Sequence, residues 1–107
     1  MSEPDPQLTP EEHKAQGNEL YKAKDFAGAI ECYSQAIRLA PDNPTFYSNR
    51  SAAWQASNKM ASCLEDCVRA VELDPTFLKC LQRGLKVTAA CSTLLHSALP
   101  PLHQALN

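Results

Sequence analysis

The segments AIECYSQAIRLAP at residues 29–41 and CLEDCVRAVELDP at residues 63–75 share one pattern at a spacing of 34 residues. Each begins with a small residue, carries a second small residue seven positions later, and ends in a proline. A fixed period of this length indicates a repeated supersecondary unit. Because proline lacks an amide donor and clashes with the preceding turn, each segment is expected to be a helix that ends before its proline.

The residues before each segment extend the same pattern. A small residue, Gly17 or Ser51, is followed three positions later by a large one, Leu20 or Trp54. Small residues let helix backbones approach closely, and the large ones, together with Tyr33, fill the space between units. The pattern therefore predicts units of two closely packed antiparallel helices.

Capping signals place the helix boundaries. The motif TPEE at residues 9–12 is a capping box with proline at the first helical position, and NP at residues 43–44 repeats the cap-then-proline arrangement. The dipeptides KD at 24–25 and NK at 58–59 mark turns between helices, and Asp74 is expected to cap the next helix. The expected helices are 10–23, 26–40, 44–57, 60–73 and 76–96. No segment alternates with the period of a strand, so the expected fold class is all-α.

Length and composition narrow the class of protein. A chain of 107 residues predicts one small domain, and ten Lys plus Arg against twelve Asp plus Glu excludes a broadly basic nucleic-acid surface. The five cysteines have no disulfide-scaffold spacing, no apolar run is long enough to span a membrane, and residues 1–10 do not resemble a signal peptide. These properties predict a reduced, cytoplasmic protein that binds neither nucleic acid nor membranes.

Three stretches of the chain carry a family resemblance. KAQGNELYKAKDFAGAIECYSQAIRLAPDN at 14–43, YSNRSAAW at 47–54 and DCVRAVELDPTFLK at 66–79 resemble tetratricopeptide (TPR) repeats. More narrowly, residues 11–83 resemble the repeat domains of the heat-shock-organising, stress-induced-phosphoprotein co-chaperones. The resemblance implies a right-handed superhelix of antiparallel helix pairs, in which the first helix of each unit lines a concave groove.

Five polar residues fall on these first helices. Lys14 and Asn18 are spaced i,i+4 and share a helical face, as do Lys79 and Arg83, while Asn49 lies on the first helix of the second unit. Two ammonium groups, a guanidinium and two amides suit a ligand with carboxylates. A peptide that ends in Asp offers two of them close together, so the set favours capture of a peptide C-terminus.

The co-chaperone resemblance implies the same five residues. Those proteins hold their ligand with a carboxylate clamp of the form K-x-x-x-N, then N, then K-x-x-x-R, and all five positions match in this chain. The implied partners are the Glu-Glu-Val-Asp tails of the seventy- and ninety-kilodalton heat-shock chaperones. Selectivity between the chaperones is expected to depend on further groove positions, for which the candidates are Tyr21, Ala52, Gln55 and Ala56. Ala56 is small where related clamps often carry a basic residue.

The pattern weakens towards the C-terminus. The expected organisation is a disordered leader at 1–9, a TPR domain at 10–86 with repeats at about 10–43, about 44–77 and a partial third from 78, and an apolar tail at 87–107. The tail has no Asp, Glu, Lys or Arg, and Pro100-Pro101 would break the second helix of a third unit. Two interpretations of the tail are open: a helix that caps the repeats, or a disordered or association-prone segment.

Other chemistry is poorly represented. Cys63 and Cys67 occupy interior repeat positions, the histidines at 13, 96 and 103 are scattered, and no Cys-x-x-Cys pair occurs, so neither a metal nor a cofactor is expected. Without a phosphate-binding glycine loop or a nucleophile elbow, the chain is not expected to be an enzyme. Two functions are open: a chaperone-binding adaptor, or a repeat scaffold with a different partner and a weak or vestigial clamp.

Overall fold

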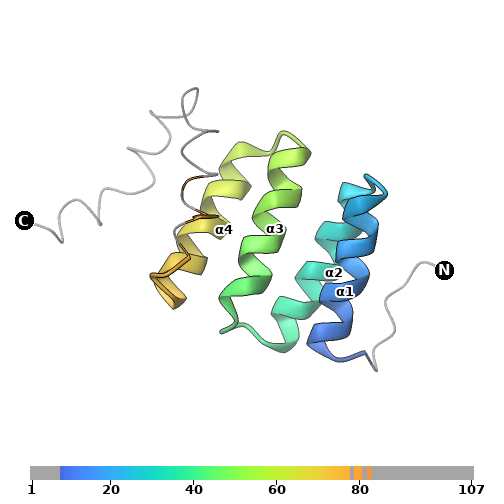
Figure 1. Cartoon of the computed structure of the whole chain (residues 1–107), viewed down its shortest axis with the longest axis horizontal. Helices are drawn as coiled ribbons and strands as arrows, with labels where there is room; N and C mark the ends of the chain where they lie inside the picture. Colours follow the sequence, from blue (N-terminus) through green and yellow to red (C-terminus); the bar gives the residue numbers. More distant parts are fainter. Residues whose placement is uncertain (1–7, 78, 81, 83–107) are drawn as a thin grey trace, which may run out of the picture.

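The computed structural model describes residues 8–77, 79, 80 and 82. The described residues form four helices: α1 Pro10–Lys22, α2 Phe26–Leu39, α3 Pro44–Ala56 and α4 Met60–Leu73 (Figure 1). Each coincides with a predicted helix, and the first three end one residue earlier than expected. The predicted all-α fold is therefore confirmed. Residues 1–7 of the expected leader, the tail at 87–107 and most of the helix expected at 76–96 lie outside the described residues.

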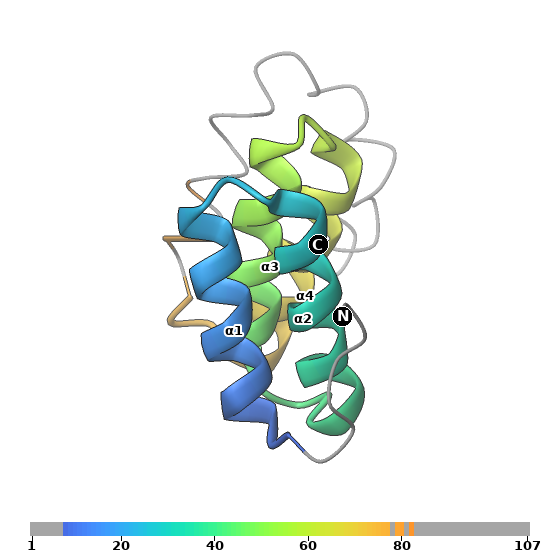
Figure 2. The ribbon, with the colours of Figure 1, turned by 90° about the vertical axis from the view of Figure 1, so that its right-hand side faces the viewer.

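The helices pack as two antiparallel pairs, α1 with α2 and α3 with α4, and α2 also packs against α3. In the two ribbon views α1 and α3 form one layer and α2 and α4 the other (Figures 1 and 2). The chain reverses within each pair at a residue with left-handed backbone, Lys24 with φ of 67° and Asn58 with φ of 65°. Both turns lie where the sequence predicted them.

The helix starts are fixed by the predicted caps. The Thr9 hydroxyl accepts a hydrogen bond from the amide of Glu12, whose carboxylate accepts one from the amide of Thr9, at 3.1 and 2.9 Å. The side chains of Asp25 and Asn43 each accept a main-chain hydrogen bond of 3.0 Å at the starts of α2 and α3. Lys59 precedes α4 without a side-chain cap. Three of the four starts thus satisfy amides that would otherwise lack a partner.

The expected start of a helix at residue 76 is wrong. Residues 75 and 76 form a turn, Phe77 is not helical, and helical backbone is described only at residues 79, 80 and 82. The cause is local, because the Asp74 carboxylate accepts hydrogen bonds from both the amide and the hydroxyl of Thr76, at 2.9 and 2.7 Å. Asp74 therefore stabilises a turn before the helix.

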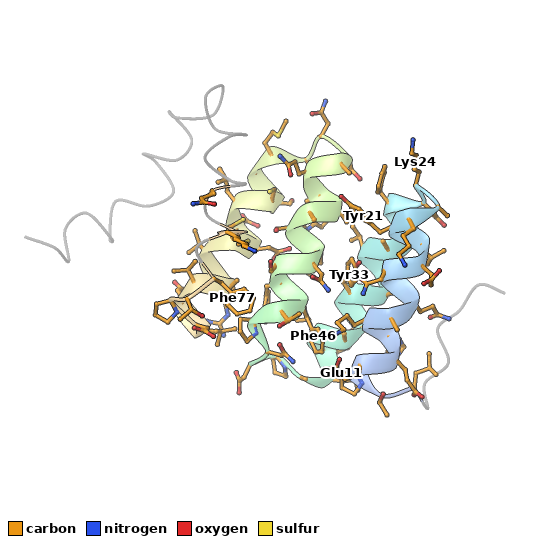
Figure 3. All side chains as sticks on the ribbon, in the orientation of Figure 1. Glu11, Tyr21, Lys24, Tyr33, Phe46 and Phe77 are labelled. Atoms are coloured by element: carbon orange, nitrogen blue, oxygen red, sulfur yellow. The ribbon has the colours of Figure 1, made fainter. Side chains whose placement is uncertain are left out.

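Small residues give the close packing that the repeat pattern predicts. Ala29, Ala36 and Ala70 are fully buried, and Gly17 lies so close to α2 that a Cβ there would be 2.7 Å from Cε1 of Tyr33. Tyr33 is buried between the helices (Figure 3), with only 2% of its surface exposed. The approach of α1 to α2 thus depends on the missing side chain of glycine.

Candidate functional site

The structure describes four of the five predicted clamp residues. Lys14 and Asn18 lie one turn apart on α1, Asn49 lies on α3 in the same layer, and Lys79 lies in the helical residues beyond α4. Arg83 lies outside the described residues. Among the four that are described, no hydrogen bond or ion pair joins one to another, so whether they act on one ligand stays a prediction.

Lys14 is held on its own helix by an ion pair. Its ammonium lies 3.0 Å from the carboxylate of Glu11, one turn earlier, and its side chain is 29% exposed. An ammonium has three donors, so one acidic neighbour leaves capacity for a ligand carboxylate. The pair also keeps the long side chain of Lys14 close to α1.

Asn18 is held from the neighbouring helix. The Tyr33 hydroxyl on α2 donates a hydrogen bond of 2.5 Å to Oδ1 of Asn18. Burial is the main cause that raises the pKa of Tyr33 to about 12, with smaller contributions from Tyr21 and Cys32. The hydroxyl therefore keeps its proton, and its capacity to donate, throughout the neutral range.

Asn49 and Lys79 are less constrained. Asn49 is half-buried on α3, Lys79 is exposed, and neither side chain makes a hydrogen bond or ion pair to another described residue. Donors without an internal partner are available to a ligand, although an exposed lysine loses side-chain entropy when it binds.

The four groove candidates lie on the two first helices. Tyr21 is half-buried on α1 and meets Phe26 edge to face, with ring centroids 5.3 Å apart. Ala52 and Gln55 are half-buried on α3, and Ala56 at its end is exposed. Of the four, Ala56 is thus the position where a larger side chain would enter solvent without displacing a packed neighbour.

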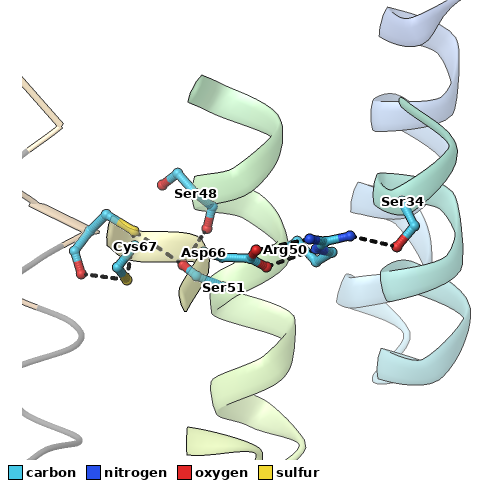
Figure 4. A network of polar contacts seen from close by, with 7 residues as sticks. Ser34, Ser48, Arg50, Ser51, Asp66 and Cys67 are labelled. Carbon is cyan, nitrogen blue, oxygen red and sulfur yellow. Dashed lines mark hydrogen bonds and ion pairs between the residues drawn. The ribbon is translucent and has the colours of Figure 1, made fainter. Parts of the chain in front are cut away.

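A charged network that was not predicted links three helices (Figure 4). The guanidinium of Arg50 on α3 donates to both carboxylate oxygens of Asp66 on α4, at 2.8 and 2.9 Å, and to the hydroxyl of Ser34 on α2 at 3.0 Å. The guanidinium also lies 5.9 Å from the centre of the Tyr47 ring. The hydrogen bonds with Asp66 are the main cause that raises the pKa of Arg50. Asp66 is an acidic residue on the mostly apolar inner face of α4. Its position in the sequence pattern of that helix could have indicated a buried carboxylate that needs a basic partner.

A second cluster attaches the residues beyond α4 to the core. Cys80 is 1% exposed, and its thiol donates a hydrogen bond of 2.7 Å to the sulfur of Cys67. The thiol of Cys67 in turn donates to the main-chain carbonyl of Cys80 at 2.9 Å. The sulfur of Cys80 also lies 3.3 Å from the hydroxyl of Ser51. Hydrogen bonding with Cys67 and burial raise the pKa of Cys80. A raised pKa disfavours the thiolate, so Cys80 lacks the environment of a nucleophile despite its neighbour Lys79.

Two properties of the described part of the chain have a bearing on function. No group of three or more His, Cys, Asp or Glu side chains within it is arranged to hold a metal ion. None of the helices that the structure describes combines the length and apolar character that a bilayer crossing needs.

Comparison with known proteins agrees with the geometry. Residues 17–56 match the TPR repeat. The N-terminal domain of stress-induced protein-1 (STI-1) from C. elegans aligns with a TM-score of 0.71 and 33% identity, over 75% of this chain and 68% of that domain. The chain belongs to the tetratricopeptide-repeat family. This TPR chain is also 44% identical over 73 residues to the heat shock protein sti1 homolog of Schizosaccharomyces pombe, a match that covers 68% of this chain but only 12% of that protein.

One similar structure contains a ligand. The first TPR of Spaghetti (RPAP3), solved with the HSP90 peptide SRMEEVD, aligns with a TM-score of 0.76 and 29% identity, over 80% of this chain and 68% of that one. The TPR chain described here is thus a protein-interaction domain, similar to domains that bind chaperone peptides.

Proposed function

We propose that this TPR chain is a chaperone adaptor that binds the acidic C-terminal tail of a heat-shock chaperone, of the Glu-Glu-Val-Asp type. The carboxylate clamp consists of Lys14, Asn18, Asn49, Lys79 and Arg83. The observation that carries the proposal is the likeness to a TPR domain solved with an HSP90 peptide that ends in EEVD, combined with clamp-type residues at all five sequence positions. The role is binding, without catalysis.

The charges of the set support a carboxylate ligand. Lys14 and Asn49 lie in the layer formed by α1 and α3, and Lys79 follows α4. Cations and amides hold a carboxylate by charge-assisted hydrogen bonds, which are shorter and stronger than neutral ones. Cys80 supports the placement of Lys79, because its buried thiol anchors the adjacent backbone to α4.

The first experiment is calorimetric titration of a peptide ending in Glu-Glu-Val-Asp into the chain. Replacing Lys79 or Arg83 by alanine removes a charged hydrogen bond to the peptide, which should weaken affinity roughly 10- to 100-fold. Circular dichroism should show the same helicity in both variants as in the wild-type chain. If both variants bind the peptide as tightly as the wild-type chain, the proposed clamp is contradicted.

Lys14 has a matched control on its own helix. Lys14→Ala should weaken peptide binding to a similar extent, whereas Lys22→Ala should leave the affinity unchanged. Lys22 is a matched control because it is also a lysine of α1 that forms an ion pair with an acid three residues earlier. A peptide with an amidated C-terminus should bind weakly to every variant. If the chain binds the amidated peptide normally, it is a scaffold with a different mode of recognition.

Chaperone selectivity is proposed to depend on Tyr21, Ala52, Gln55 and Ala56. Ala56 is the most accessible of them, so Ala56→Lys tests the idea with little effect on packing. The readout is the ratio of affinities for tail peptides of the seventy- and ninety-kilodalton chaperones. An unchanged ratio would remove Ala56 from the set.

We place the protein in the cytoplasm. The four cysteines in the described part of the chain are buried thiols that form no disulfide with one another, which fits a reducing compartment; they are Cys32, Cys63, Cys67 and Cys80. Fractionation of cells that produce the protein tests this placement.

A further inference from the structure

Asn18 can serve a carboxylate ligand in only one orientation of its amide. The Nδ2 atom has two donors and Oδ1 has none, whereas a carboxylate only accepts hydrogen bonds. Turned by 180° about its last torsion, the amide would present an oxygen to the ligand and repel it. An asparagine that binds carboxylates therefore benefits from a neighbour that fixes which atom faces the ligand.

Tyr33 is such a neighbour. Its hydroxyl donates to Oδ1 of Asn18 at 2.5 Å, while Nδ2 makes no hydrogen bond to any other residue that the structure describes. When a carboxylate accepts from Nδ2, all three groups are satisfied only if the tyrosine donates to Oδ1. The hydroxyl, amide and carboxylate then form a chain in which each hydrogen bond polarises the next.

The position of the hydroxyl is fixed by packing. Tyr33 is 2% exposed, and its ring lies against the backbone of Gly17, the residue before Asn18. Because glycine has no Cβ, the ring can approach α1 closely enough for its hydroxyl to reach the amide. The raised pKa of Tyr33, about 12, keeps the donor proton in place at neutral pH.

We propose that Tyr33 is a positioning residue for the peptide site, holding the Asn18 amide with Nδ2 directed to a ligand carboxylate. The inference rests on the proposed function and extends it to a residue of the second helix that does not itself touch the ligand. It assigns one buried hydroxyl a role in affinity that is separate from the role of its ring in packing.

The test is Tyr33→Phe, which removes the hydroxyl and keeps the ring. Affinity for a peptide ending in Glu-Glu-Val-Asp should fall about 3- to 10-fold, the effect of one neutral hydrogen bond. The matched control is Tyr47→Phe, because Tyr47 is also buried and its hydroxyl donates to the carbonyl of Pro41 at 2.9 Å. That variant should retain affinity. Thermal unfolding establishes that both variants fold.

A double-mutant cycle separates positioning from a general structural effect. If Tyr33 acts through Asn18, the hydroxyl should have no further effect once the amide is gone, so Asn18→Ala and the double variant with Tyr33→Phe should bind equally. If Tyr33→Phe lowers the affinity by the same factor in the wild-type chain and in Asn18→Ala, the inference is overturned. It is also overturned if Tyr33→Phe binds the peptide as tightly as the wild-type chain.

The inference and the proposed function can fail separately. Normal peptide binding that is weakened by Lys14→Ala but not by Tyr33→Phe refutes only the positioning role. If the folded wild-type chain does not bind the peptide at all, the proposed function fails and the positioning role fails with it.

Discussion

Replacing Asp66 by alanine should destabilise the fold far more than the loss of an ordinary ion pair. The variant removes both charge-assisted hydrogen bonds of Arg50, at 2.8 and 2.9 Å, in a site where the two side chains are only 21% and 7% exposed. Breaking a buried pair from one side costs about 3–5 kcal/mol, because the remaining charge is left without a partner. Arg50 keeps its bond to Ser34 and partial access to water, so we expect the lower end of that range.

The assay is urea unfolding followed by far-UV circular dichroism. Domains of this size have unfolding free energies of about 5–15 kcal/mol, so the loss should shift the midpoint strongly while the slope stays unchanged. The control is Glu72→Ala, which removes an exposed pair with Arg69, 3.4 Å long and with side chains 46% and 57% exposed. That change should cost less than about 0.5 kcal/mol.

Two results would refute this reasoning. If Asp66→Ala and Glu72→Ala have equally small effects, the network around Arg50 behaves as a surface contact. If the double replacement Arg50→Met and Asp66→Leu is no more stable than Asp66→Ala, the penalty does not arise from an uncompensated charge, because apolar residues of similar volume should recover most of it.

Three further predictions concern the fold. Gly17→Ala should lower the unfolding free energy by about 1–3 kcal/mol, measured by urea unfolding, because the new Cβ would be 2.7 Å from the Tyr33 ring; an unchanged midpoint would contradict the packing. Thr9→Ala removes the cap of α1 and should cost about 0.5–2 kcal/mol in the same assay, whereas Ser57→Ala, which removes a hydroxyl beyond α3, should cost less. Hydrogen bonding with Cys63 is the main cause that raises the pKa of Cys67 from 9.0 to about 11, so the unfolded chain loses this proton first: this thiol alone should lower the unfolding free energy by about 1.4 kcal/mol per pH unit between pH 9 and 11, Cys80, whose pKa is also raised, should steepen the loss, and a flat profile of urea midpoints against pH would exclude the shift.

The sequence predicted those parts of the fold that depend on neighbouring residues. The caps at Thr9, Asp25 and Asn43 and the turns at Lys24 and Asn58 are local, so their residue types indicated them directly. The expected start of the last helix at residue 76 was wrong, because Asp74 satisfies a turn as readily as a helix cap and the sequence does not distinguish the two uses.

Contacts between helices could not be predicted in the same way. Arg50 and Asp66 are 16 residues apart, and Asn18 and Tyr33 are 15 apart, so each contact depends on how two helices cross. Arg50 was therefore overlooked although it adjoins the predicted clamp residue Asn49. The clamp itself remains a prediction from five residue types, one of which, Arg83, lies outside the described residues.

Arg50 has a consequence for how the two repeats share their stability. In a linear array each unit touches only its neighbours, and cooperativity depends on the interface between units. Here one guanidinium binds Asp66 in its own unit and Ser34 in the preceding one. If α4 frays, the guanidinium loses its counter-charge and with it the orientation that reaches α2, so disruption in one unit weakens the other. We therefore expect states with a single folded repeat to be disfavoured, and the two units to unfold together as one cooperative block.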